Sequence, residues 1–341
     1  MIDVGEFLGI PNATPETQEL VGCEVRVVSD TSIEGYTRIR NGWNRGGAYT
    51  VYFFAVFDQP ADFHGTWKND AINQNNLWEW DSGEPAGAYF GYKPKTVGRV
   101  IKVKVGISFI GVNKAKHNLK EIPHWSLEKT VADAQNKWNS LLKKVEVEGM
   151  AEKQKRIFYT ALYHSYLMPV DRTGENPKWN SSKPYYDDFY AIWDTYRTVH
   201  PLFTLLTPKR QSEIISSMID IYEYDGYMPE GRSGNYNGRV QGGTNSDIML
   251  ADAMVKGLKD IDYEKGFLAM KKNAEIPPGG TERQEGRGGI LKYKELGYVP
   301  YNREVSKNIW YDFEPFVYER AGTRTVEYAH CDHALATSLK N

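Results

Sequence analysis

The hydrophobic pattern of this chain changes its period once, part-way along the sequence. Up to about residue 112, residues 23–29 and 99–109 alternate apolar and polar side chains, and residues 48–57 form a β-branched and aromatic run. Such patterns are typical of strands. From about residue 113 the apolar residues recur at steps of three and four, which is typical of helices. A single change of this kind predicts a β domain followed by an all-α domain.

Loops rich in Gly, Pro, Asn and Asp separate the expected strands, so the first part is predicted to be an antiparallel β-sandwich or a large part of one. Residues 65–80 are predicted to form a long polar loop. The boundary is expected between residues 123 and 149. The predicted organisation is a partial β-sandwich domain over residues 1–122, a helical linker over 123–149 and a helical domain over 150–341.

The helical part is punctuated by proline, glycine and capping residues. Asn245 or Ser246 is the expected N-cap of one helix, and Asp225-Gly226 is a left-handed cap signal at the end of another. Two Gly-rich loops, 228–243 and 277–289, are candidates for function because long ordered loops often carry binding residues. The expected helices are 113–122, 127–142, 153–168, 189–206, 211–224, 246–257, 262–273 and 323–339.

Charge and cysteine content exclude several classes of protein. A formal net charge of −2 argues against a nucleic-acid partner. Residues 1–30 show no basic stretch followed by an apolar one, and no run of about 18 apolar residues that could span a membrane occurs. Only Cys23 and Cys331 are present, too few for a disulfide framework or a multi-thiolate zinc site. The compartment stays open.

The segment around Trp193 combines aromatic, acidic and basic side chains. On the helix expected over 189–206, Trp193 lies one turn from Arg197, and Asp194 lies beside them. A flat ring for the C–H face of a sugar, with a carboxylate and a guanidinium for its hydroxyls, is sugar-binding chemistry. Aromatic residues at 13% of the chain agree with this interpretation. The alternative is a buried Trp beside a satisfied Asp–Arg pair.

Several segments in order resemble glycoside hydrolase family 92 between about residues 35 and 339. They are 42–57, 103–109, 156–164, 192–202, 243–247 with 251–253, 285–287, 296–300 and 326–329. Members of that family are calcium-dependent, inverting exo-α-mannosidases, mainly α-1,2-mannosidases, with an N-terminal β-sandwich and a C-terminal (α/α)6 barrel, and the resemblance implies the same fold and activity class here. Here it implies the first half of that barrel, and a mannose-containing oligosaccharide or N-glycan as the partner.

The resemblance also implies site residues. It places Trp193 and Asp194 in a mannose-binding pocket, supported by Arg197. Asp247 matches an acidic position of the family, and Asn245 stands where many relatives carry His. The last two substrate-binding candidates, Glu285 and Arg287, fall in a loop at the same end of the barrel. For Asp247, Glu285 and Arg287, hydrogen bonding within the loop or at the helix start is as open an interpretation as a substrate contact.

The resemblance does not supply catalytic or metal-binding residues in this chain. The family's general acid, its His-Gly-Asn-Glu segment near calcium and its Gly-Asn-Asp segment with the general base are expected beyond Asn341, and an early sandwich segment is expected before Val25. We therefore nominate no catalytic residue and no metal ligand. Neither Asp187 with Asp188 nor Asp220 with Glu223 is proposed as the carboxyl pair that inverting hydrolysis needs.

Three interpretations stay open. The chain is a fragment or short product of an α-mannosidase, a non-catalytic sugar-binding module, or a different (α/α)6 enzyme such as a disaccharide phosphorylase or amylase-like glucan hydrolase. His330 and His333, which flank Asp332, are a weak candidate for a divalent metal site.

Overall fold

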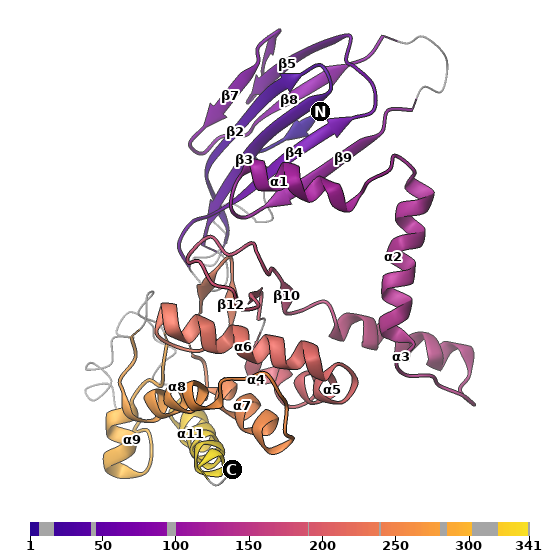
Figure 1. Ribbon diagram of the computed structural model, residues 1–341. Coiled ribbons are helices and arrows are strands. Elements are labelled where there is room, and N and C mark those ends of the chain that lie inside the picture. The colour runs from indigo at the N-terminus through magenta and orange to yellow at the C-terminus, as the bar shows by residue number, and fades with distance from the viewer. Residues whose placement is uncertain are drawn as a thin grey trace. The chain divides into compact units, whose positions relative to one another are not determined.

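The computed structural model describes residues 1–6, 17–41, 46–93, 100–189, 191–238, 240–279, 285–301 and 320–339. Gly42 and Trp43 of the first family-like segment lie outside these ranges. The chain divides into two compact units, Met1–Glu146 and Val147–Asn341. Strands dominate the first and helices the second (Figure 1), so the predicted fold class, a β-sandwich followed by a helical region, is confirmed.

The first unit contains two antiparallel sheets, of order β1-β8-β5-β6 and β7-β2-β3-β4-β9. Apolar side chains between them form a core that includes Val25 and Ile33, each 0% exposed. Burial of this kind is the main stabilising contribution to the sandwich. The strands are β1 (Ile2–Asp3), β2 (Glu19–Ser29), β3 (Ser32–Arg40), β4 (Tyr49–Phe57), β5 (Phe63–Lys68), β6 (Ala71–Gln74), β7 (Trp78–Asp81), β8 (Ala86–Gly91) and β9 (Val103–Ser108).

The long polar loop predicted for residues 65–80 is wrong, because most of this segment lies in β5, β6 and β7. Asn69 and Asn75 have positive φ angles, 50° and 59°. Asn tolerates this conformation better than most residues, so the two turns are tight. Two more polar side chains, Asn73 and Gln74, lie on β6, which is exposed along its whole length. The polarity therefore reflects turns and an edge strand.

Two helices follow the sheets in the first unit, α1 (Val112–Asn118), continued by the short 3₁₀ helix η1 (Leu119–Glu121), and α2 (Leu127–Leu142). Gly106 on β9 allows α1 to approach closely, since a Cβ there would lie 2.2 Å from the carbonyl oxygen of Ala115. The α2 helix has the predicted bounds, and the Ser126 side chain caps it by accepting a hydrogen bond from the Lys129 N–H.

The second unit is mainly helical, with two short ribbons, β10 (Val170–Asp171) with β11 (Tyr186–Asp187) and β12 (Arg232–Ser233) with β13 (Tyr236–Asn237). Gly226, with φ of 92°, ends α6 as predicted. The α9 helix was not predicted. The helices are α3 (Glu152–Ser165), α4 (Ile192–Thr195), α5 (Val199–Leu206), α6 (Pro208–Asp225), α7 (Asn245–Val255), α8 (Tyr263–Glu275), α9 (Ile290–Leu296) and α11 (Ala321–Ser338).

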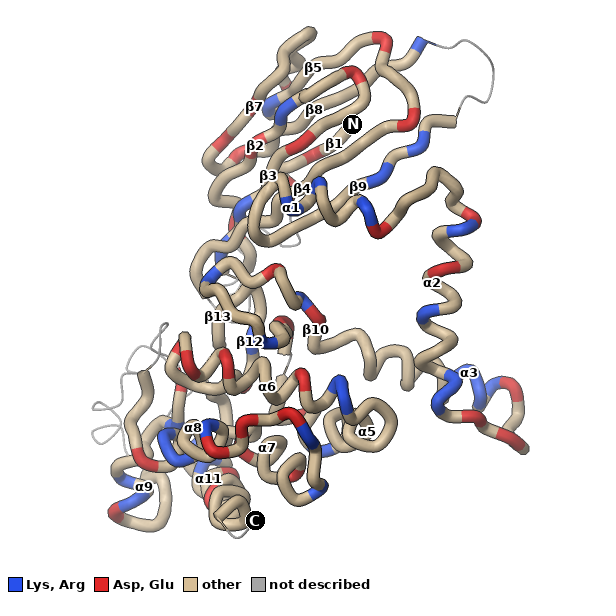
Figure 2. Tube along the Cα trace, in the orientation of Figure 1, with Lys and Arg blue, Asp and Glu red and all other residues tan. Residues whose placement is uncertain are grey.

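Opposite charges are interspersed along both units, and Figure 2 shows no long single-sign stretch among the residues it colours. Both cysteines are free and buried. A search of the described helices finds none with the length and apolarity that crossing a membrane requires. Membership of these helices in an (α/α)6 barrel stays a prediction.

Candidate functional site

A cavity of about 350 Å³ lies in the second unit. Segments far apart in the sequence form it: α4, the loop before α7, and the first turns of α11. Its lining residues are Trp193, Gln241, Gly242, Asn245, Arg320, Thr323 and Glu327. One indole ring, several uncharged hydrogen-bonding groups, one guanidinium and one carboxylate therefore surround a space of the size of a small-ligand site.

The single helix predicted for residues 189–206 is wrong, because residues 196–198 separate two shorter helices, α4 and α5. Ala191 has a positive φ of 35°, which an α-helix cannot accommodate. Pro201 lacks an N–H, and in a helix interior its ring would clash with the carbonyl of Arg197. The chain instead forms α4, breaks, and starts α5 with Pro201 in its first turn. Trp193 lines the cavity from α4, and Arg197 lies in the break between the two helices.

Arg197 and Asp194 lie on the exposed side of this segment. The Arg197 guanidinium packs 4.6 Å from the Tyr196 ring centre and forms a 3.4 Å ion pair with Glu327. Because Glu327 lines the cavity, Arg197 reaches the site through that carboxylate. Asp194 is exposed and is not one of the lining residues, so its contact with mannose stays a prediction.

Asn245 lines the cavity from the first turn of α7. Its side-chain amide donates a 3.3 Å hydrogen bond to the Gly243 carbonyl, while its Oδ1 atom is buried and has no hydrogen-bond partner among the described residues. A sugar hydroxyl is a donor that could satisfy this oxygen. The predicted N-cap is wrong by one residue, because Thr244 occupies the cap position and α7 begins at Asn245.

Asp247 and Arg287 form a buried ion pair of 3.0 Å and are each 0% exposed in their side chains. Asp247 also accepts hydrogen bonds from Thr244 (2.6 Å) and Asn273 (2.9 Å), and Arg287 also donates to Thr244 (2.9 Å) and Asp332 (2.5 Å). This set of five residues ties the start of α7 to the last turn of α8 and to the middle of α11. Asp247 and Arg287 are not among the residues that line the cavity, so their contact with substrate stays a prediction.

Glu285 lies apart from the cavity. It is 2% exposed, and its backbone bridges to Gly279, with a 3.0 Å hydrogen bond from the Gly279 N–H. Burial, followed by the negative charge of Glu285, raises the pKa of the Tyr227 hydroxyl to about 12. The substrate contact predicted for Glu285 stays a prediction, since the residue is not among those that line the cavity.

Glu230 connects two walls of the cavity, and the sequence did not single it out. Its Oε1 atom accepts hydrogen bonds from the Ser246 N–H (2.8 Å) and hydroxyl (2.5 Å), and its backbone carbonyl accepts one from the Ile192 N–H (2.9 Å). Glu230 therefore links Ile192, which precedes Trp193, to Ser246, which follows Asn245. Burial raises the pKa of Glu230 to about 8 despite the hydrogen bonds from Ser246.

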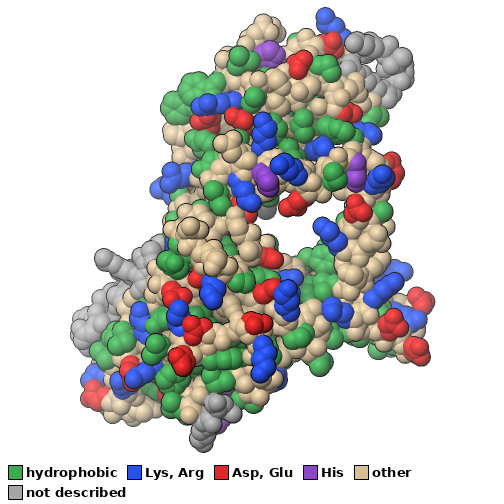
Figure 3. Space-filling model, in the orientation of Figure 1, with side chains coloured by type: hydrophobic (Ala, Val, Ile, Leu, Met, Phe, Trp, Pro, Cys, Tyr) green, Lys and Arg blue, Asp and Glu red, His purple; other side chains and the backbone are tan. Residues whose placement is uncertain are grey.

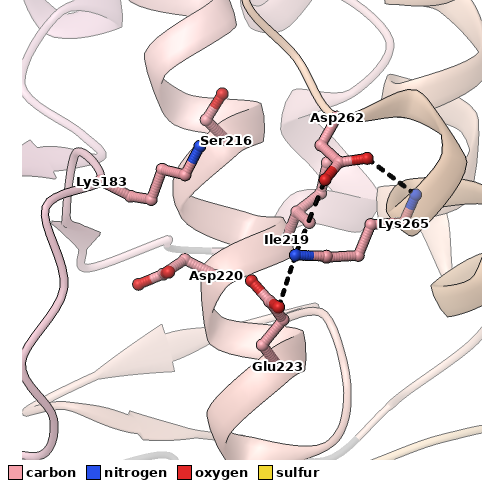
Figure 4. Close-up of a pocket in the computed structure, with 7 residues that line it drawn as sticks. All are labelled: Lys183, Ser216, Ile219, Asp220, Glu223, Asp262 and Lys265. Carbon is pink, nitrogen blue, oxygen red and sulfur yellow. Dashed lines mark hydrogen bonds and ion pairs between the residues drawn. The ribbon is translucent and has the colours of Figure 1, made fainter.

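Other acidic residues of the second unit are held by ion pairs or hydrogen bonds. Lys265 forms ion pairs with Glu223 (2.5 Å) and Asp262 (3.6 Å) beside a hollow of about 20 Å³ (Figure 4), which is too small for a sugar. Asp220, which lines the same hollow, accepts a 2.8 Å hydrogen bond from the indole of Trp179. Asp220 and Glu223 therefore have structural partners, and Asp220 is only 4% exposed.

Asp187 and Asp188 share one cation. Arg172 contacts Asp187 at 3.0 Å and Asp188 at 2.7 Å, and Arg232 contacts Asp187 at 2.9 Å. Burial, then the charge of Asp187, raises the pKa of Asp188, while Arg172 opposes this shift. The two arginines explain why Asp187 and Asp188 lie in this position, so neither carboxylate needs a catalytic role to explain it.

Two family models match consecutive parts of the chain. The glycosyl hydrolase family 92 N-terminal domain matches residues 5–108, and the family 92 catalytic domain matches residues 114–341. The chain belongs to glycoside hydrolase family 92. The catalytic-domain match includes Trp193, Asn245 and the remaining residues that line the cavity.

Relatives of this family 92 chain include a curated protein from Arthroderma benhamiae, described as an uncharacterized secreted glycosidase. It is 32% identical over 258 residues, which cover 73% of this chain and 29% of that protein. A family 92 α-mannosidase from Bacteroides thetaiotaomicron, solved with mannoimidazole, is 25% identical with a TM-score of 0.77, over 95% of this chain and 41% of its own.

A second solved structure from the same organism, an inverting family 92 mannosidase, is also 25% identical, with a TM-score of 0.74 over 94% of this chain and 45% of its own. The chain therefore spans about 29% to 45% of the length of these relatives.

The described residues do not fit the calcium site implied by the family resemblance. Within the ranges that the structure covers, no group of three or more His, Cys, Asp or Glu residues could hold a metal ion. Near the weak candidate formed by His330 and His333, Asp332 is bound by Arg287.

Proposed function

We propose that this family 92 chain forms the sugar-binding part of an exo-α-mannosidase that acts on α-linked mannosides such as those of N-glycans. In this proposal the cavity at Trp193 holds one mannose unit. The observation that carries it is the position of Trp193 at a cavity of about 350 Å³, beside a buried oxygen of Asn245 that has no hydrogen-bond partner within the described part of the chain. Solved family 92 α-mannosidases, one with mannoimidazole bound, support the choice of sugar.

The lining residues suit a neutral sugar. The Trp193 ring offers an apolar face for sugar C–H groups, and the Asn245 oxygen accepts from a hydroxyl. Arg320, Thr323 and Glu327 supply donors and acceptors on the α11 side. Arg197 holds Glu327 in place through their 3.4 Å contact. Asp194, from its exposed position, is proposed to reach a second sugar unit at the rim.

Trp193→Ala is expected to weaken binding of mannoimidazole by about 5- to 150-fold, since loss of an aromatic contact and its buried area costs about 1–3 kcal/mol. Titration calorimetry measures the change, and thermal melting shows whether the variant is folded. Tyr224→Ala is the matched control, because that ring is 52% exposed and does not line the cavity. Equal affinities of the two variants, or no binding by the unmodified chain, would contradict the proposal.

A second candidate function, sugar binding without catalysis by this chain itself, follows from the acids at the cavity. Inverting hydrolysis uses two carboxyl groups on opposite sides of the glycosidic bond. Among the described residues that line the cavity, Glu327 is the only carboxylate. A proton donor and a base would therefore not both be available.

We expect no measurable release of mannose from α-1,2-linked mannobiose by this chain in calcium buffer. Each missing member of an acid–base pair typically costs about 10²- to 10⁴-fold in rate. The assay compares the unmodified chain with Glu327→Gln and with boiled protein. Turnover that Glu327→Gln abolishes would place the catalytic machinery in this chain and overturn the second candidate.

A further inference from the structure

Two exposed tryptophans lie on the outer face of the five-stranded sheet. Trp78 and Trp80 are 47% and 49% exposed, and they lie on β7, an edge strand of that sheet. Their spacing of two residues puts both side chains on one side of the strand. Hydrophobic side chains gather over β7 in the space-filling view (Figure 3). Exposed aromatic surface of this extent commonly marks an interaction site.

The two rings form a platform. Their centres are 6.5 Å apart and their planes differ by 28°, so the rings are close to parallel. The Lys68 ammonium lies 5.6 Å from the centre of the Trp80 ring and is ion-paired to Asp81 at 2.6 Å. These contacts hold one end of β7 in place, and so the platform is largely formed before any ligand binds.

Hydrogen-bonding groups lie directly beside the platform. In the antiparallel register of β2 with β7, Arg26 lies opposite Trp78 and Glu24 lies opposite Trp80. Residues directly opposite each other share a face of the sheet. Arg26 and Glu24 contact each other at 2.5 Å, and the Arg26 side chain is 56% exposed. On β3, Tyr36 continues the row from Glu24.

We propose that this β7 platform (Trp78, Trp80, Glu24, Arg26 and Tyr36) binds a neutral polysaccharide of hexopyranose units. Two near-parallel rings fit the C–H faces of neighbouring sugar units, while the adjacent carboxylate and guanidinium hydrogen-bond their hydroxyls. The platform lies in the first unit and Trp193 in the second, so the proposed function does not include it.

The same contacts disfavour two other occupants. A second copy pairing with the edge of β7 would need its backbone carbonyls, but those of Trp78 and Trp80 already accept from Asn76 (2.6 Å) and Lys68 (3.3 Å). A polyanion would need an excess of positive charge, whereas Arg26 and Lys68 each have an acidic partner.

Native electrophoresis of the full chain in gels that contain soluble α-mannan, and in parallel gels that contain dextran, tests this proposal. We expect at least one polysaccharide to retard the chain, with an affinity that falls about tenfold in Trp78→Ala and in Trp80→Ala. Trp80→Phe keeps a flat ring and should keep most of the binding. Leu77→Ala is the matched control, because Leu77 is 53% exposed and directly precedes β7, where the alternation of the chain puts its side chain on the side opposite to Trp78 and Trp80.

Thermal melting shows which variants are folded, and light scattering reports their oligomeric state. Retardation that survives in folded Trp78→Ala and Trp80→Ala, or that disappears in Trp193→Ala instead, would overturn the proposal. So would the absence of retardation by both polysaccharides. A dimer that both platform variants dissociate, without any retardation, would assign the face to self-association and reject sugar binding.

Discussion

Arg287→Met is expected to destabilise the second unit by about 3–5 kcal/mol, the typical cost of removing one partner from a buried ion pair. The Asp247 carboxylate would keep only Thr244 and Asn273 as hydrogen-bond donors in a position that is 0% exposed. Asp332 would also lose its contact with Arg287. Urea unfolding, with the midpoint compared at an unchanged m value, measures the loss.

Arg197→Met is the matched control, since it removes the same group from the Arg197–Glu327 contact, where the Arg197 side chain is 57% exposed. Exposed ion pairs contribute about 0–1 kcal/mol, so this variant should stay close to the unmodified chain. The double variant Asp247→Leu with Arg287→Met should recover part of the loss, because it leaves no buried carboxylate without a cation at Asp247. Equal stabilities of the two arginine variants would disprove the supporting role of Arg287.

Loss of Arg287 is also expected to affect the candidate site. Asp247 and Arg287 were predicted from the family resemblance as substrate-binding residues; they form a buried ion pair and are not among the residues that line the cavity. The ion pair spans α7 and the segment before α9, and Asp332 extends it to α11. Since α7 and α11 carry Asn245 and Glu327, loss of Arg287 should also weaken mannoimidazole binding, through displaced walls.

Local sequence signals predicted those elements whose ends depend on their own residues. Ser126 and the periodic apolar residues after it define α2, and Gly226 ends α6. The segment at Trp193 could not be predicted in this way, because the expected periodicity continued through residues 189–206 although Pro201 and Ala191 interrupt the helix. Pro201 was a signal against a continuous helix, and the positive φ of Ala191 depends on tertiary contacts.

The site itself was only partly visible in the sequence. Trp193 and Asn245 could be nominated from motifs, but the cavity also uses Arg320, Thr323 and Glu327, which lie more than a hundred residues beyond Trp193. In the sequence, Glu230 is only a single acidic residue in a Gly-rich loop, and no motif marks it as part of a site. Its role depends on being 1% exposed and on contacting Ser246, and both are properties of the folded chain.

Glu230→Gln is expected to remove a fall in stability between about pH 5 and pH 8. Burial raises the pKa of Glu230 to about 8 in the folded state, from its ordinary value of 4.5. Between these values the folded chain keeps a proton that the unfolded chain has released, so stability falls as pH rises, by up to about 1.4 kcal/mol per pH unit. Below this window both states hold the proton and the contribution is complete.

Thermal melts of the two proteins across pH 5–9 measure this difference. Glutamine carries no charge, and its side-chain oxygen can still accept from the Ser246 N–H and hydroxyl, so the variant should match the unmodified chain near pH 5 and melt higher near pH 8. Glu230→Ala is the complementary variant. It leaves both Ser246 donors without this acceptor and should lose about 1–3 kcal/mol for each buried unsatisfied group, independently of pH.

Parallel pH curves for the unmodified chain and Glu230→Gln would show that Glu230 is ionised in the folded state throughout this range. Binding gives a second readout, because Glu230 fixes Ile192 and Ser246, the neighbours of Trp193 and Asn245. Glu230→Gln should therefore retain mannoimidazole affinity, whereas Glu230→Ala should weaken it even at temperatures where the variant remains folded. A folded Glu230→Ala variant with full affinity would mean that the two cavity walls keep their arrangement without this carboxyl group.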